Sequence, residues 1–234
     1  MEETVTIARR FRGPPESGNG GYSCGIAAAF LDGPAEVTLR KPPPLDTPLR
    51  VERGAQGVTL FDQADVVAEA KAAALDIAPP APPSWAEAVE ASSRYPWRET
   101  HPYPSCFVCG SQRTAGDGLC VWPGKVAGRD LAAAPFAPAA DLYGADGLLR
   151  PEIVWASLDC PSWYGYFTVH PFDSKVLLGR LAARIDSRPR AGERCICVGW
   201  FLAREGRKVH CGSALYSESG ALHATGKATW IVLK

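Results

Sequence analysis

The sequence lacks an excess of charge of either sign and any long apolar run, and each absence excludes a class of protein. Its 234 residues include 25 Lys and Arg against 25 Asp and Glu, so the formal net charge is zero. No basic run with interleaved aromatic residues is present, which argues against a nucleic-acid partner. No apolar run approaches the roughly 18 residues that a membrane-spanning helix needs. We therefore expect no nucleic acid and no membrane among its partners.

A basic start is also missing, because Glu2 and Glu3 follow the first methionine. Secretory signals begin with positive charge, so the sequence predicts a cytoplasmic protein. Disulfides rarely persist in that compartment. The eight cysteines are therefore expected to be reduced thiols.

Metal ligands are few, since the chain has four histidines and one cysteine pair with C-x-x-C spacing. Cys106 and Cys109 have the C-x-x-C spacing of metal ligands, with His101 and Cys120 nearby in the sequence. A structural zinc site requires four ligands and usually a second clear pair. We therefore predict no metal, and a zinc site at Cys106 and Cys109 is the alternative.

Apolar periodicity and turn residues divide the chain into two portions, each with the order strand, helix and four strands. Asn19 is a good N-cap for the first helix, and Pro151 suits the first turn of the second. Pro161 is expected to end or kink that second helix. The expected strands are 3–12, 35–41, 49–53, 57–61, 66–74, 119–122, 131–134, 176–187, 194–204, 208–216 and 222–233, and the expected helices are 20–31 and 149–163.

The shared order indicates an internal duplication. The last hairpins of the two portions align without a gap, with 57–67 over 212–222. This alignment predicts a strand at 66–74, although its alanines also suit a helix. The predicted domains are a first repeat at 1–78, a proline-rich linker at 79–105 with a short helix near 85–92, and a second repeat at 106–234.

Several motifs of the second portion resemble a known family. Cys106-Phe107-Val108-Cys109-Gly110, followed by Gly116-Asp117-Gly118-Leu119, is similar to the opening of hotdog-fold acyl-CoA thioesterases of the phenylacetate-pathway type. The run 192–220 is similar to the strands of that family. The resemblance implies an α+β protein of two tandem hotdog folds, each a long antiparallel sheet wrapped around a central helix, fused as a pseudo-dimer. A homodimer of such double hotdogs is also expected.

The resemblance also implies the site. In that family the central helix begins with a His-Gly-Gly type motif, whose backbone N–H polarises a thioester carbonyl. A carboxylate about two turns along the partner helix acts as nucleophile or general base. On the first repeat the motif falls on Asn19, Gly20 and Gly21, while its acid position is Ala28. On the second repeat the acid position is Asp159.

The second repeat has Arg150-Pro151-Glu152 at the motif, and proline has no N–H to donate. The resemblance therefore implies one composite site, with Asn19, Gly20 and Gly21 facing Asp159, and an incomplete mirror site. Asparagine in place of histidine departs from the family pattern. The alternative roles are a simple N-cap for Asn19 and a helix-end carboxylate that meets a loop or an arginine for Asp159.

The predicted activity is hydrolysis of an acyl-CoA or another acyl thioester, with coenzyme A as part of the substrate and no separate cofactor. Predicted substrate contacts are Tyr22, Trp155, Ser162 and Trp163, for which core packing is the alternative. A non-catalytic acyl-thioester-binding protein is the second functional hypothesis. A hydratase is third, because hotdog hydratases have a histidine shortly after the aspartate and 159–169 contains none.

Overall fold

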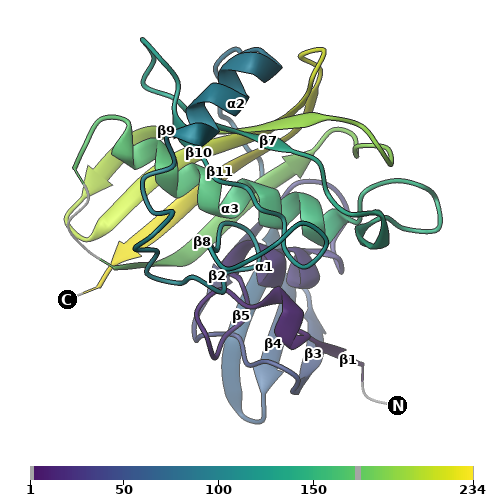
Figure 1. Ribbon diagram of the computed structural model, residues 1–234. Coiled ribbons are helices and arrows are strands. Elements are labelled where there is room, and N and C mark those ends of the chain that lie inside the picture. The colour runs from purple at the N-terminus through teal and green to yellow at the C-terminus, as the bar shows by residue number, and fades with distance from the viewer. Residues whose placement is uncertain (1–2, 172–174, 234) are drawn as a thin grey trace.

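The described residues form one antiparallel sheet of eleven strands that curves around two central helices (Figure 1). The computed structural model describes residues 3–171 and 175–233. The helices are α1 (Gly20–Ala28), α2 (Trp85–Ser93) and α3 (Pro151–Phe167). The strands are β1 (Thr4–Thr6), β2 (Ala35–Leu39), β3 (Pro48–Gly54), β4 (Gly57–Asp62), β5 (Asp65–Ala72), β6 (Gly124–Lys125), β7 (Ala132–Phe136), β8 (Val176–Ile185), β9 (Cys195–Glu205), β10 (Lys208–Ser217) and β11 (Leu222–Val232).

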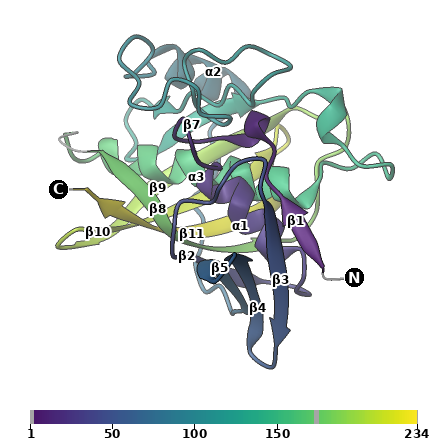
Figure 2. The same cartoon turned by 90° about the horizontal axis from the view of Figure 1, so that it is seen from below.

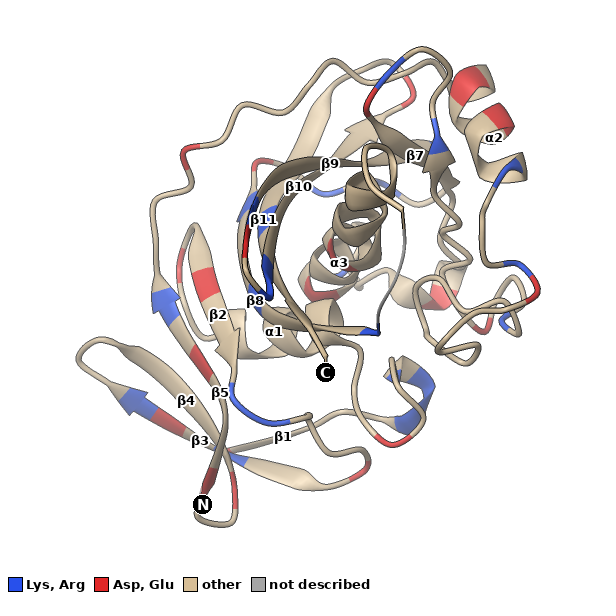
Figure 3. Cartoon of the chain, turned by 90° about the vertical axis from the view of Figure 1, so that its left-hand side faces the viewer, with Lys and Arg blue, Asp and Glu red and all other residues tan. Residues whose placement is uncertain are grey.

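The order of the strands repeats in the two portions of the chain. The sheet order is β1-β3-β4-β5-β2 and then β8-β11-β10-β9-β7-β6. The first five strands therefore match β7 to β11 one for one, and each set wraps a helix that follows its first strand. Strands β8 to β11 curve around α3 (Figure 3). The two sets join where β2 pairs with β8, with Val37 opposite Leu181.

The predicted order of strand, helix and four strands is confirmed in both portions, including a strand rather than a helix at β5. The domain limits at 78, 105 and 106 stay a prediction, because the sheet is continuous across the β2–β8 pairing. The short linker helix is present as α2, which begins with a capping box between Ser84 and Glu87. The buried Ala88 and Ala91 of α2 pack on a small apolar cluster with Val126 and Trp200.

Two strand predictions were wrong in detail. Residues 3–12 form only the short strand β1 and then a 3₁₀ turn at Arg9–Phe11. Residues 119–122 are not a sheet strand, because Leu119 and Val121 donate their N–H groups to the carbonyls of Phe107 and Val108. This extended, apolar segment therefore pairs with the cysteine-containing turn instead of joining the sheet.

Helix α3 continues through Pro161 to Phe167, so the predicted end near residue 161 was wrong, while a kink there stays a prediction. Proline inside a helix removes one hydrogen bond and costs about 3 kcal/mol or more. Packing of the following turns offsets this cost. Trp163 and Tyr166 are buried and stacked with ring centroids 5.0 Å apart. Gly199 of β9 also lies so close that a Cβ there would be 1.7 Å from the Pro161 carbonyl oxygen.

Helices α1 and α3 lie side by side inside the sheet (Figure 2). Gly21 and Gly25, one turn apart on α1, form the contact. A Cβ at Gly25 would lie 2.6 Å from Cα of Glu152, and one at Gly21 would lie 2.5 Å from Cβ of Asp159. The nearest neighbours of Gly25 are therefore Glu152 and Trp155 of helix α3. The backbones approach because neither glycine has a side chain.

Among the described residues, the helices are too short or too polar to cross a membrane.

We expect Gly25→Ala to lower the free energy of unfolding by about 1–3 kcal/mol, because the added methyl overpacks the contact with α3. In an isolated helix the same change would stabilise by about 1 kcal/mol. Chemical denaturation measures the difference. Gly54→Ala is the matched control, since the nearest atom to a Cβ there lies at 3.9 Å. A Gly25→Ala protein more stable than the parent would contradict the helix contact.

Candidate active site

Asp159 lies on α3 at the point where α1 begins, and it is 2% exposed. Its Oδ2 atom accepts a hydrogen bond from the backbone N–H of Gly21 at 2.9 Å. The same atom accepts a second hydrogen bond from Nδ2 of Asn19 at 2.7 Å. The structure thus brings together two motifs that are 138 residues apart.

Asn19 has two functions at this helix start. Its Oδ1 accepts a hydrogen bond from Tyr22 N at 2.9 Å, which confirms the predicted N-cap. Its amide nitrogen donates to Asp159 and also faces Cys106 Sγ at 3.8 Å. Capping fixes the side-chain orientation, and that orientation directs the amide nitrogen toward the carboxylate.

The carboxyl group of Asp159 is electrostatically unusual. Burial raises its pKa to about 7 and the nearby Cys106 adds to this rise, while hydrogen bonds from Gly21 and Asn19 oppose it. Burial dominates because taking a carboxylate out of water disfavours its charged form. The Oδ1 atom is buried and has no hydrogen-bond partner among the described residues. One oxygen is therefore fixed by two donors, and the other is left unpaired by the protein.

A cavity of about 290 Å³ lies beside Asp159. It is mainly apolar and receives residues from both repeats and from the linker. Its lining includes Gly18, Asn19, Gly20, Leu39, Pro43, Trp97, His101, Tyr103, Cys106, Cys109, Asp159, Cys160, Trp163, Tyr164, Val176, Leu178 and Trp230.

Of the four predicted substrate contacts, Trp163 lines this cavity and the others lie elsewhere. Tyr22 stacks on Phe11 with ring centroids 4.1 Å apart, and burial raises its pKa to about 12. Ser162 is fully buried, where it donates to the Asp159 carbonyl and accepts from Nε1 of Trp230. Trp155 packs at the contact between α1 and α3, against Gly25.

Sequence reasoning missed the residues that the linker brings to the cavity, chiefly Trp97, His101 and Tyr103. Their proline-rich surroundings resemble a connector. The one local signal is their aromatic content, which is unusual for a simple spacer.

The mirror position lies in a second cavity of about 810 Å³, whose lining includes Ala28, Pro151 and Trp155. Here α1 contributes the methyl group of Ala28 and no carboxylate. Helix α3 begins at Pro151, which has no N–H to donate. Glu152 pairs with Arg150 at 3.4 Å. The two related positions therefore differ in the groups on which the chemistry depends.

Comparisons with known proteins identify the fold. No family model and no curated protein matches the sequence. Acyl-CoA thioesterase II TesB2 of Mycobacterium marinum matches with a TM-score of 0.60 at 13% identity, over 98% of this chain and 92% of that one. The tesB protein of Mycobacterium avium subsp. paratuberculosis matches with a TM-score of 0.56 at 12% identity, over 93% and 88% of the two chains.

A conserved protein of unknown function with a hot dog fold from Alicyclobacillus acidocaldarius matches with a TM-score of 0.54 at 9% identity, over 100% of this chain and 92% of that one. At such identities the likeness establishes the fold alone. The chain has the TesB-like double hotdog fold. The predicted α+β class and tandem hotdog architecture are confirmed.

We expect Asp159→Asn to leave the free energy of unfolding unchanged or to raise it by about 1 kcal/mol. The amide has nearly the same shape as the carboxylate but carries no charge that must be buried. Neither donor to the carboxylate is a cation, so no ion pair is broken. Thermal and chemical denaturation test this. A loss of about 3 kcal/mol would indicate instead a charge that holds the fold through pairing.

Proposed function

We propose that this protein hydrolyses an acyl thioester, with acyl-CoA as the substrate class, at one composite site between α1 and α3. The observation that carries the proposal is Oδ1 of Asp159, a buried carboxylate oxygen beside an apolar cavity that has no hydrogen-bond partner in the described part of the chain. Leaving a buried polar atom unpaired costs about 1–3 kcal/mol or more. A reacting molecule that enters the cavity would supply the missing partner.

The arrangement supports a simple division of roles. Gly21 N–H and the Asn19 amide hold Oδ2, so Oδ1 is the oxygen that removes a proton from water or attacks the thioester carbonyl. In the base-catalysed route, the water oxygen bonds to the carbonyl carbon as Asp159 takes the proton. The C–S bond then breaks, and the proton goes to the leaving thiolate.

The carbonyl oxygen requires a donor of its own. The resemblance implied Gly20 and Gly21 together, but the N–H of Gly21 already donates to Asp159. Gly20 is the first residue of α1 and lines the cavity. The first N–H groups of a helix have no partner within it and lie at the positive end of its dipole. We assign the Gly20 N–H to the developing oxyanion, a contact worth about 3 kcal/mol of transition-state energy.

The cavity suits an apolar acyl group. Trp163, Leu178 and Trp230 supply large apolar surface next to the carboxylate. Each methylene of an acyl chain that moves from water into such a cavity contributes about 0.8 kcal/mol. The similar M. marinum fold belongs to a protein named as an acyl-CoA thioesterase, which supports the same substrate class.

Asp159→Asn is expected to lower kcat/KM for acyl-CoA hydrolysis by about 10²–10⁴-fold, the usual contribution of a positioned acid–base group. Release of free thiol across a panel of acyl-CoA chain lengths measures the rate. Glu152→Gln is the matched control, because it makes the same change on the same helix, and it should retain the parent rate. Equal rates in Asp159→Asn and the parent would refute the assignment.

A parent protein that binds acyl-CoA without any turnover would favour the alternative, a non-catalytic acyl-thioester-binding protein. The observation that favours this alternative is Asn19, which stands where the family motif has histidine.

Asn19→Ser should lower kcat/KM by about tenfold, because a hydrogen bond to a charged group is worth about 1.5 kcal/mol or more. Serine can still cap the helix, so the stability should change little. Asn19→Ala should lose the same rate and also about 1 kcal/mol of stability. Paired kinetic and unfolding measurements separate the two contributions. Full activity in Asn19→Ser would mean that the amide does not position Asp159.

A further inference from the structure

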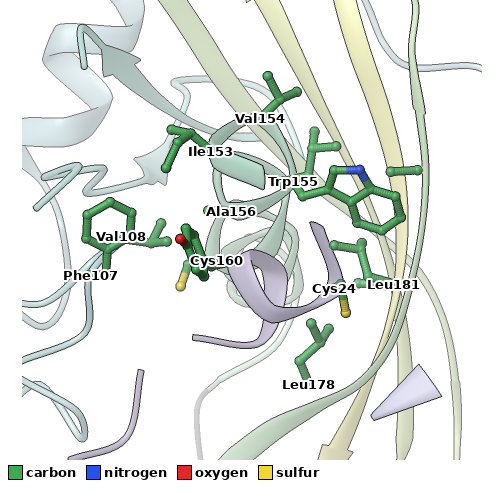
Figure 4. Packing of buried hydrophobic residues seen from close by; sticks show 14 of the residues in the cluster. Cys24, Phe107, Val108, Ile153, Val154, Trp155, Ala156, Cys160, Leu178 and Leu181 are labelled. Atoms are coloured by element: carbon green, nitrogen blue, oxygen red, sulfur yellow. The ribbon is translucent and has the colours of Figure 1, made fainter. Parts of the chain in front are cut away.

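Three buried cysteine sulfurs converge at one side of the cavity. Cys106 and Cys109 come from the C-x-x-C turn, and Cys160 comes from α3 directly after Asp159. The three Sγ atoms lie within 4.8 Å of one another, and Cys106 Sγ is 3.9 Å from Cys160 Sγ. In Figure 4, Cys160 lies on the side of α3 that faces Val108, inside the turn. All three are free thiols, so no disulfide explains their proximity.

We propose that Cys106, Cys109 and Cys160 bind one zinc ion as thiolates, with a fourth position open to the cavity beside Asp159. The sequence predicted no metal because it offered one cysteine pair. Cys160 is 54 residues from Cys106 and becomes a neighbour only when α3 packs against the turn.

The spacing of the sulfurs matches the ion. Zinc–thiolate bonds of about 2.3 Å in a tetrahedral site place neighbouring sulfurs about 3.8 Å apart. The observed 3.9 Å between Cys106 and Cys160 is close to that value, and a disulfide would require about 2.05 Å. Tetrahedral sulfur-rich sites favour zinc among the common divalent ions.

The turn that carries Cys106 and Cys109 is tightly closed. Gly110 closes the turn by donating its N–H to the Cys106 carbonyl at 2.9 Å. A Cβ at Gly110 would lie 2.4 Å from the Pro104 carbonyl oxygen, so only glycine fits.

Two further donors face the sulfurs and would offset the negative charge of three thiolates around a divalent ion. Nδ2 of Asn19 lies 3.8 Å from Cys106 Sγ. Nε2 of His101 lies 3.3 Å from Cys109 Sγ, while its Nδ1 accepts a hydrogen bond from Tyr103 N. Since Nδ1 is an acceptor, Nε2 carries the ring proton and donates it to the sulfur. His101 is therefore a hydrogen-bond donor to a ligand, as is common around zinc sites.

The fourth position then falls to the cavity, which all three cysteines line. Zinc sites that take part in chemistry keep such a position open, whereas purely structural sites fill it with a fourth side chain. An ion here would share the cavity with Asp159 and the bound thioester.

Metal content tests this directly on the reduced protein as purified, after desalting into metal-free buffer; a chelator then prepares the zinc-free protein for titration. We expect one zinc ion per chain by inductively coupled plasma mass spectrometry. We also expect thiolate-to-metal charge-transfer absorption when cobalt replaces zinc. X-ray absorption at the zinc edge should show three sulfur neighbours. Zinc-free protein that gives no charge-transfer band on titration with cobalt would overturn the proposal, and this titration depends on no variant.

Cys160→Ser and Cys106→Ser should each lower the zinc affinity by more than about tenfold. Cys120→Ser is the matched control, because Cys120 is a partly exposed thiol outside the cluster, and it should retain one zinc ion. Unchanged zinc content in folded Cys160→Ser, with folding checked by circular dichroism, would contradict the ligand set. No thioester enters these measurements, so their outcome is independent of the proposed hydrolase activity.

Discussion

The contact between α1 and α3 at Gly21 and Gly25 is the constraint on which the remaining structure depends. It lets the first backbone N–H groups of one helix reach the carboxylate of Asp159 on the other. A Cβ at Gly21 or Gly25 would lie 2.5 or 2.6 Å from an atom of α3, so a side chain at either position would push the helices apart. The same contact sets where the two portions of the sheet meet, because each helix lies in the curve of its own strands.

The two repeats contribute unlike groups to this contact. The first gives a helix start with backbone N–H donors, one of which binds the carboxylate, and the second gives Asp159. Burial of that carboxylate is unfavourable, and the two hydrogen bonds to Oδ2 offset part of its cost without neutralising it. At the related position, Ala28 and Pro151 replace both groups, so packing is retained there without the buried charge.

Much of this arrangement could be predicted from the sequence, because order and motif position depend on local patterns. The repeated elements and the N-cap at Asn19 follow from such patterns, whereas the meeting of that helix start with Asp159 was implied by the family resemblance. The continuation of α3 through Pro161 depends on packing by distant strands. Ser162 points into the core, and Cys160 meets the C-x-x-C turn only through tertiary structure. Periodicity identifies the face of a helix but not the segment that covers it.

The pairing of β2 with β8 has a consequence for the evolution of the chain and for any attempt to produce one portion alone. These strands are the last of each portion's sheet, and each covers the other's open edge. A single portion on its own would present a row of unsatisfied backbone groups there, which is a template for aggregation or for pairing with a second copy. Because the two portions are covalently linked, the strand that covers each open edge is always present in the same chain. The linkage also frees each portion to accumulate different substitutions, which a symmetric pair of identical chains cannot do.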